Sequence, residues 1–392
     1  MKVTTQYDVI IIGAGPAGAT CALQLRHSGL RVLLLDKATF PRTKICGDAV
    51  VGRSIKTLYT CCPELIADFR QFSAKTRITH TRLHINGKKP FDIHWVNEAY
   101  CCRRIDFDNC LINAVRKYAS NVTILENFVV DCIENGINSE KNSAYQGIKV
   151  GNEAKQQFFQ AKIIVGCDGA QSIVNKKMTD TKLSHAHHVG AVRTYFKGLK
   201  GLNINRTEVF VLPNFSPGYF WVFPLSEDTA NIGFGMLTEK ISEKKINLRK
   251  ALLDFIEQSL ILRGCFEGSE QIGKIEGFGL PLGSRRVTMS GNHFLLAGDA
   301  ASLIDPASGD GISNAIISGK VAGETILEAF KINDFTASFL EKYDSAVYKN
   351  LGKELMHSTI ILRLFVRMPF LLNIVAALMN IPFFKRLGKK WM

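Results

Sequence analysis

The chain has 392 residues, of which 46% are hydrophobic and 21% are charged, a composition typical of folded globular proteins that excludes a disordered chain. Its 49 lysines and arginines exceed its 35 aspartates and glutamates, and the formal net charge of +14 predicts attraction to anions such as acidic lipids or phosphorylated ligands. A nucleic-acid partner is not expected, because no recognition module or basic tail accompanies this charge.

The ten cysteines include the neighbours Cys61–Cys62 and Cys101–Cys102 but no CxxC pair. The first apolar run starts almost at the N-terminus, so no secretory leader is expected. We therefore expect reduced thiols in a cytoplasmic protein, either free in the cytosol or on the cytosolic face of a membrane.

The first predicted elements form a dinucleotide-binding unit. Residues 7–12 are β-branched and uninterrupted, as in a buried parallel strand, and the following turn, Gly13-Ala-Gly-Pro-Ala-Gly18, opens a helix that runs through Arg26. Such glycines allow a tight turn and close approach to a pyrophosphate, which the amides at the helix N-terminus bind. A second strand, 31–35, ends in an aspartate at the spacing of a ribose-binding carboxylate. The candidate cofactor ligands are Gly13, Gly15, Ala17, Gly18 and Asp36.

The next loop, Phe40-Pro-Arg-Thr-Lys-Ile-Cys-Gly-Asp48, is cationic and carries a thiol beside a glycine. From the residues alone, Cys46 is either a buried inert thiol or a functional group.

An antiparallel sheet is predicted from two regions. Strands at 81–85 and 91–95 flank an Asn86–Gly87 turn, a strong hairpin signal, and further strands are expected between 189 and 236. Within the second region, alternation places Tyr219, Trp221 and Phe223 on one face of a strand, as either core or a binding surface.

Two later segments each combine a strand with an acidic turn. Residues 161–172 contain Asp168-Gly169, and residues 294–312 contain Gly298-Asp299 and a glycine-rich loop that opens a helix over 313–330. Either segment alone is also compatible with a loop whose aspartate caps a helix.

Together these motifs resemble the flavoprotein group that includes para-hydroxybenzoate hydroxylase, geranylgeranyl reductases and flavin-dependent halogenases. The P-R-x-K-x-C-G loop and the Y-x-W-x-F-P strand are most similar to the geranylgeranyl reductase family. The resemblance implies FAD as cofactor, Asp299 at its ribityl chain, and an arginine near its phosphates from the R-x-x-F-D-x-x-L motif that begins at Arg104. It implies a substrate cavity lined by Tyr219, Trp221 and Phe223, and a catalytic candidate in Cys46. The other implied cofactor contacts are Lys37, Cys46, Gly47, Ala49, Val130, Asp168, Gly311 and Ile312.

Two positions depart from the family pattern. Asn175 stands where an arginine is usual, which speaks against direct use of NADPH, so NAD(P)H, another reductant or an electron-donor protein all stay open. Leu225 replaces a lysine that commonly follows the aromatic strand.

The last segment, 356–392, is apolar, contains Pro369 and Pro382, and ends with cations and Trp391. This pattern favours a helix in the headgroup region of an anionic membrane, with a cap on the substrate cavity or a membrane span as alternatives.

The sequence thus predicts an α/β fold with a Rossmann-like FAD-binding domain, an inserted antiparallel β-sheet substrate domain and a C-terminal helical segment. We expect the FAD-binding domain at 1–75, 101–185 and 285–355, the substrate domain at 76–100 and 186–284, and the C-terminal segment at 356–392. The expected function is an FAD-dependent oxidoreductase that reduces carbon–carbon double bonds of an isoprenoid or related lipid by hydride transfer. A monooxygenase is the chief alternative, followed by a halogenase and an electron-transfer flavoprotein. No metal site is expected, because the histidines at 185, 187 and 188 lack further ligands at a metal-binding spacing.

Overall fold

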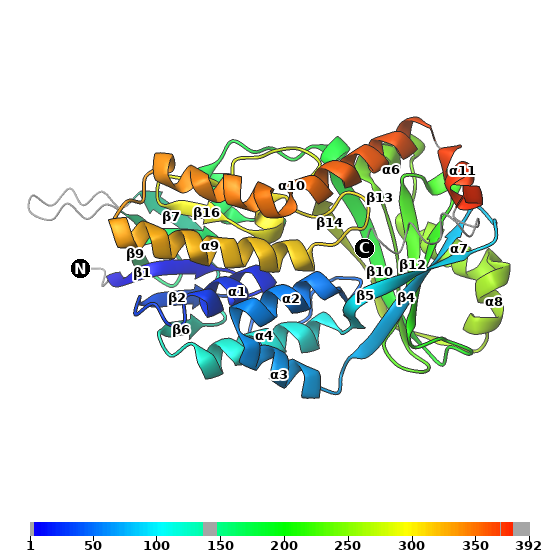
Figure 1. The fold of residues 1–392 in the computed structure, drawn as a ribbon, viewed down its shortest axis with the longest axis horizontal. Coiled ribbons are helices and arrows are strands. Elements are labelled where there is room, and N and C mark those ends of the chain that lie inside the picture. Colours follow the sequence, from blue (N-terminus) through cyan, green and yellow to red (C-terminus); the bar gives the residue numbers. More distant parts are fainter. Residues whose placement is uncertain (1–3, 136–146, 369, 379–392) are drawn as a thin grey trace, which may run out of the picture.

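The computed structural model describes residues 4–135, 147–368 and 370–378, and it arranges them around two eight-stranded sheets (Figure 1). The predicted α/β fold is confirmed, with a mixed sheet that has a parallel centre next to a largely antiparallel sheet. The cations and Trp391 expected at the C-terminus lie outside the described residues.

The first sheet is built around β1 (Thr4–Ile12), which pairs in parallel with β2 (Val32–Leu35) on one side and β9 (Gln157–Gly166) on the other. Both faces of β1 are covered, which explains its unbroken apolar sequence. The remaining strands of this sheet are β6 (Val122–Leu125), β7 (Cys132–Asn135), β8 (Ile148–Asn152), β15 (Ser290–Gly291) and β16 (Phe294–Leu296).

Helix α1 (Pro16–Gln24) packs closely on α9 (Ile312–Ile332) (Figure 1). A side chain at Gly319 of α9 would meet the carbonyl oxygen of Ala17 at 2.2 Å, so only glycine allows this approach. Helix α1 ends two residues earlier than predicted, because Arg26 N–H donates to the Leu23 carbonyl in a turn. The other helices beside this sheet are α2 (Gly52–Cys61), α3 (Pro63–Gln71), α4 (Arg104–Tyr118) and α5 (Ile173–Met178).

The second sheet contains the predicted hairpin, now β4 (Thr76–Ile85) and β5 (Phe91–Cys101), with left-handed residues Asn86 and Gly87 in the turn. Its strand order is β14-β10-β13-β12-β11-β4-β5-β3. The parallel pairing of β11 with β4 is a departure from the expected antiparallel pattern. The strands are β3 (Ala49–Val50), β10 (His188–Lys197), β11 (Arg206–Val211), β12 (Gly218–Pro224), β13 (Ala230–Leu237) and β14 (Glu270–Pro281).

Three short helices cover one face of the second sheet over β10–β13. Phe220 and Phe234 stack on this face with ring centroids 4.0 Å apart, and residues of the helices complete the core around them. The opposite face, formed by the alternate residues, is directed toward the first sheet and its loops. The covering helices are α6 (Thr238–Lys244), α7 (Leu248–Gln258) and α8 (Leu260–Phe266).

The long helix α10 (Ala337–Arg367) runs from the first sheet to the second, where α11 (Leu371–Leu378) follows it (Figure 1). Phe365 and Leu372 pack with Ile85 and Phe91 of the β4–β5 hairpin. Within the described ranges, no helix combines the length and apolarity needed to cross a bilayer.

Candidate active site

The turn after β1, from Gly13 to Gly18, is packed so closely that glycine is required at two positions. Gly13 has φ = 99°, and a side chain there would lie 2.3 Å from the Cys167 carbonyl oxygen at the end of β9. A side chain at Gly18 would lie 1.8 Å from the Gly13 oxygen. The structure brings the predicted acid to this turn, since Ala14 N–H donates to Asp36 Oδ2 over 2.8 Å.

A second guanidinium, that of the arginine in the P-R-x-K-x-C-G loop, lies beside the turn. Arg42 Nη2 is 3.5 Å from the position that a Gly15 side chain would take, and its Nη1 is 3.0 Å from Asp108 Oδ2. The predicted Arg104 is buried and binds the same carboxylate with both Nε and Nη2, at 2.7 and 2.6 Å. Arg42 Nε also lies 3.8 Å from Asp36 Oδ1, so two guanidinium groups and two carboxylates gather next to the glycine turn.

Three predicted segments converge around Lys44 in the middle of the 40–48 loop. Lys44 Nζ lies 3.2 Å from Asp299 Oδ2 and 3.7 Å from the position of a Gly169 side chain. Asp299 Oδ1 in turn lies 3.3 Å from the position of a Gly311 side chain, just before α9 begins at Ile312. The Asp-Gly turn, the Gly-Asp segment and the helix N-terminus are therefore neighbours in space.

Asp168 contacts the start of α5. Its Oδ2 accepts from Ile173 N–H over 2.7 Å at the start of α5, and burial raises the pKa of its carboxyl group. Asn175, which replaces the usual arginine, donates from Nδ2 to the Ala300 carbonyl over 2.8 Å. Here the asparagine connects α5 to the segment that carries Asp299.

The aromatic residues of β12 share the face that is directed toward the Cys46–Gly47 loop. A side chain at Gly47 would lie 3.4 Å from the Phe223 ring and 3.5 Å from Trp221 Nε1. Tyr219 OH donates to the Ser308 carbonyl over 2.5 Å, in the glycine-rich loop before α9. The predicted row of aromatics thus spans the distance between two loops of the first sheet, and the departing residue Leu225 packs near its Phe223 end.

Cys46 is partly exposed and keeps its proton at neutral pH. Burial raises the pKa of its thiol, and this effect outweighs the opposing influence of the nearby Arg104 guanidinium. The arrangement favours a thiol that donates a proton over a thiolate nucleophile.

The remaining predicted residues lie at the edges of these clusters. Ala49 lies in β3, Ala17 is buried in the first turn of α1, and Ile312 is buried where α9 begins. Lys37 is exposed next to Asp36, while Val130 belongs to the core beneath the first sheet.

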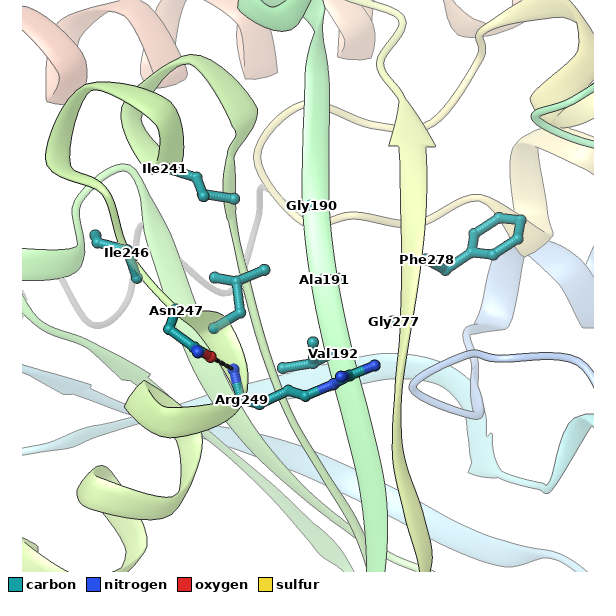
Figure 2. Close-up of a pocket in the computed structure, with 10 residues that line it drawn as sticks. Gly190, Ala191, Val192, Ile241, Ile246, Asn247, Arg249, Gly277 and Phe278 are labelled. Carbon is teal, nitrogen blue, oxygen red and sulfur yellow. Dashed lines mark hydrogen bonds between the residues drawn. The ribbon is translucent and has the colours of Figure 1, made fainter.

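A surface hollow of about 410 Å³ lies on the other side of the second sheet, between β10 and helices α6 and α7 (Figure 2). Ile241, Leu248 and Arg249 line it, and Figure 2 shows the Phe278 ring pointing away from it. This hollow is separate from the converging loops, because Val192 in its floor belongs to the helix-covered core.

The site residues fit FAD. The tight turn requires its glycines, because a side chain at Gly13 would overlap the Cys167 backbone and one at Gly18 would overlap the Gly13 oxygen, and the Arg42 guanidinium lies beside the turn. Asp36 accepts a hydrogen bond from the turn and Asp299 lies beside Lys44, and carboxylates are suitable partners for ribose and ribityl hydroxyl groups.

Comparisons with known proteins agree with this geometry. The family model described as "FAD binding domain" matches residues 6–345. A digeranylgeranylglycerophospholipid reductase of Methanosarcina acetivorans is 27% identical over 92% of this chain and 85% of its own length. Digeranylgeranylglycerophospholipid reductase 1 of Methanococcoides burtonii is also 27% identical, over 91% of this chain and 83% of its own.

Two solved structures show the same fold. A geranylgeranyl bacteriochlorophyll reductase-like protein of Thermoplasma acidophilum superimposes with a TM-score of 0.78 at 22% identity, covering 92% of this chain and 88% of its own. The flavin-dependent brominase Bmp2 superimposes with a TM-score of 0.77 at 21% identity, covering 98% of this chain and 93% of its own.

Proposed function

The chain belongs to the FAD binding domain family, and from this premise we propose that it uses its FAD-dependent oxidoreductase chemistry to reduce carbon–carbon double bonds of an isoprenoid lipid. The resemblance to geranylgeranyl reductases is confirmed by relatives that bear that activity in their names. The lipid class and the reaction are our proposal.

The observation that carries the proposal is the aromatic row of β12. Tyr219, Trp221 and Phe223 present an apolar wall to the loops that hold Gly47 and Gly309, where a lipid chain would lie against the cofactor. Gly235 stands opposite Tyr219 on β13 and adds no side chain of its own, and the side chains of Val189, Ala191 and Trp221 pack over it and extend the apolar wall.

We assign the cofactor to the converging loops. The glycine turn would hold the pyrophosphate, Asp36 the ribose and Asp299 the ribityl chain, while the start of α9 would face the flavin ring. Arg42 and Lys44 would contribute positive charge along the same path. The assigned contacts are Gly13, Gly15, Ala17, Gly18, Asp36, Lys37, Cys46, Gly47, Ala49, Arg104, Val130, Asp168, Asp299, Gly311 and Ile312.

When bound and reduced, FAD supplies a hydride to one carbon of the double bond and is oxidised. The second carbon needs a proton, and we assign its donation to the Cys46 thiol, whose raised pKa keeps it protonated. The thiolate left behind lies beside the Arg104 guanidinium, which stabilises its charge until solvent returns the proton. The aromatic row orients the chain and excludes water.

We also propose that the protein is cytoplasmic and binds an anionic membrane peripherally through α10 and α11. Met356, Ile360 and Leu364 project apolar side chains into solvent from one stripe of α10, with the cations Arg363 and Arg367 alongside. Such a stripe suits the headgroup region of a bilayer, from which a lipid substrate would come. The physiological reductant is not assigned, and NAD(P)H, another reductant and an electron-donor protein all stay open.

The test is an anaerobic titration. The purified FAD-loaded protein is reduced with dithionite and mixed with isoprenoid lipids, and the oxidised flavin absorbance is followed. We expect reoxidation by the lipid without oxygen and a product heavier by two hydrogens. The Cys46→Ala variant should bind the lipid normally but reoxidise about 10²–10⁴-fold more slowly, as expected for loss of a proton donor.

If only oxygen reoxidises the protein and oxygen or a halogen enters the product, the chain is a monooxygenase or a halogenase. The superposition with the brominase supports only the shared fold.

A further inference from the structure

Two buried residues outside the predicted site, Asn231 and Asp48, connect the second sheet to the Cys46–Gly47 segment. We propose that they are positioning residues that set the distance between this segment and the aromatic row. The inference rests on the proposed function in one respect, namely that the aromatic row is the substrate wall.

Asn231 lies on β13 with no exposed surface, and its carboxamide makes three hydrogen bonds. Its Nδ2 donates to the Cys46 carbonyl and to Asp48 Oδ2, both over 2.8 Å. Its Oδ1 accepts from Trp221 Nε1 over 2.9 Å. One side chain therefore holds both the loop and the central aromatic of the wall.

Asp48 extends this connection to two more elements. Its Oδ2 also accepts from Tyr195 OH of β10 over 2.8 Å, and its Oδ1 accepts from the N–H of Arg104 at the start of α4 over 3.1 Å. The residue is fully buried and has φ = 66°, so the loop turns at this point. A left-handed aspartate at a turn is held by such side-chain bonds.

The connection matters because even a single carbon added at Gly47 would touch the wall. The position of a Gly47 side chain is 3.4–3.5 Å from Phe223 and Trp221, while the Trp221 ring lies directly across Gly233 and has no room to retreat. The loop alone can therefore move, and Asn231 and Asp48 restrain it. A displacement of about 1 Å at a reacting centre costs roughly 10²-fold in rate.

The first test compares Asn231→Leu with a matched control, Asn121→Leu. Asn121 makes a similar clamp elsewhere, donating from Nδ2 to the Leu25 and Leu30 carbonyls over 3.0 and 2.9 Å. In the FAD-loaded protein we expect Asn231→Leu to speed amide hydrogen exchange in residues 45–49 by about tenfold or more, since several buried hydrogen bonds are lost. The control should leave that exchange unchanged.

The second readout is single-turnover reoxidation by the lipid. Asn231→Leu should slow it by roughly 10²-fold while the FAD dissociation constant changes by less than about threefold, and Asn121→Leu should change neither rate nor exchange at the loop. If Asn231 had a purely structural role, the reoxidation rate would fall only in proportion to the fraction of protein that has lost FAD.

A paired exchange provides a rescue. Asn231→Asp alone places two carboxylates in contact, and we expect the same faster exchange at 45–49. Adding Asp48→Asn restores one amide–carboxylate hydrogen bond and should slow that exchange again. Unchanged exchange in Asn231→Leu, or no recovery in the double variant, would overturn the positioning role. Failure of every lipid to reoxidise the wild-type protein would overturn the proposed function alone, because the exchange measurements do not use a lipid.

Discussion

Gly13 is the residue at which the cofactor turn and the first sheet meet most closely. A Gly13→Ala change combines a left-handed backbone with a 2.3 Å overlap on the Cys167 carbonyl oxygen, so we expect a loss on the order of 3 kcal/mol and weak FAD binding. Gly29→Ala is the matched control, with φ = 72° but no heavy atom within 4 Å, and should cost about 1 kcal/mol. Urea unfolding measures the stability of both variants and FAD titration measures their cofactor binding. Equal losses of stability in the two variants would refute the steric argument.

The carboxyl of Asp344 gives the folded protein a distinct pH dependence. Burial raises its pKa, so the folded state holds the proton more tightly than the unfolded state, and stability falls as pH rises from about 4 to the folded-state pKa. Asp344→Asn should therefore become more stable relative to the wild type across that window and then level off. Urea unfolding midpoints between pH 4 and 8 provide the measurement.

Asp334 supplies a control of opposite sign. Its pKa is lowered by the N–H and hydroxyl of Thr336, so it contributes stability above its ordinary pKa that is lost on acidification. Asp334→Asn should lose stability relative to the wild type as pH rises. A pH-independent difference for both variants would contradict the assignment.

Among single residues, the sequence predicts only those site residues that belong to a recognisable motif along the chain. The roles of Gly13, Asp299 and the aromatic row are predicted from such motifs. In the structure all of them lie beside the loops of the first sheet. Asn231 could not be predicted, because its bond to Cys46 joins residues 185 positions apart. Arg42 and Lys44 belong to the P-R-x-K-x-C-G loop, but their partners could not be predicted, since Asp108 and Asp299 come from distant segments.

Among the elements, α1 and α9 carry the two ends of the cofactor site and are held together by glycine. Gly319→Ala places a methyl group 2.2 Å from the Ala17 oxygen, which must push α9 away from the glycine turn. We expect a loss on the order of 2 kcal/mol and weaker FAD binding. Thermal unfolding with and without FAD tests this.

Gly352 of α10 is the corresponding helical control. A side chain there meets only Tyr348, at an ordinary 3.5 Å, so Gly352→Ala should gain about 1 kcal/mol from helix propensity. If Gly319→Ala is equally well tolerated, close packing of α1 on α9 does not limit the site.

Elements with a strong internal period were predictable, and pairings between distant elements were not. The hairpin at β4–β5 and the helix after Gly311 follow from turn residues and alternation. The parallel pairing of β11 with β4 depends on contacts across about 125 residues, for which the sequence carries no local signal. The division of the chain into three cofactor pieces and two substrate pieces stays a prediction.

For the whole molecule, the proposed membrane contact depends on the outer stripe of α10. Replacing Ile360 and Leu364 together with glutamine should abolish cosedimentation with vesicles that contain anionic lipid, since both apolar side chains are exposed. Leu260→Gln on α8, where the side chain is 88% exposed, is the control and should bind normally. Loss of binding in the control instead would place the contact on α8.

The central strand of the first sheet acquires its neighbours at very different times. β2 begins at residue 32, directly after α1, but β9 begins at residue 157 and the Gly311–Ile312 end of the site follows much later. At ribosomal speeds, roughly 10–30 s separate the synthesis of β1 from that of β9. During this interval the edge of β1 that later pairs with β9 is open and can pair with other nascent chains. FAD cannot cover it at this stage, because the Asp299 and Gly311 parts of its proposed site have not yet been translated.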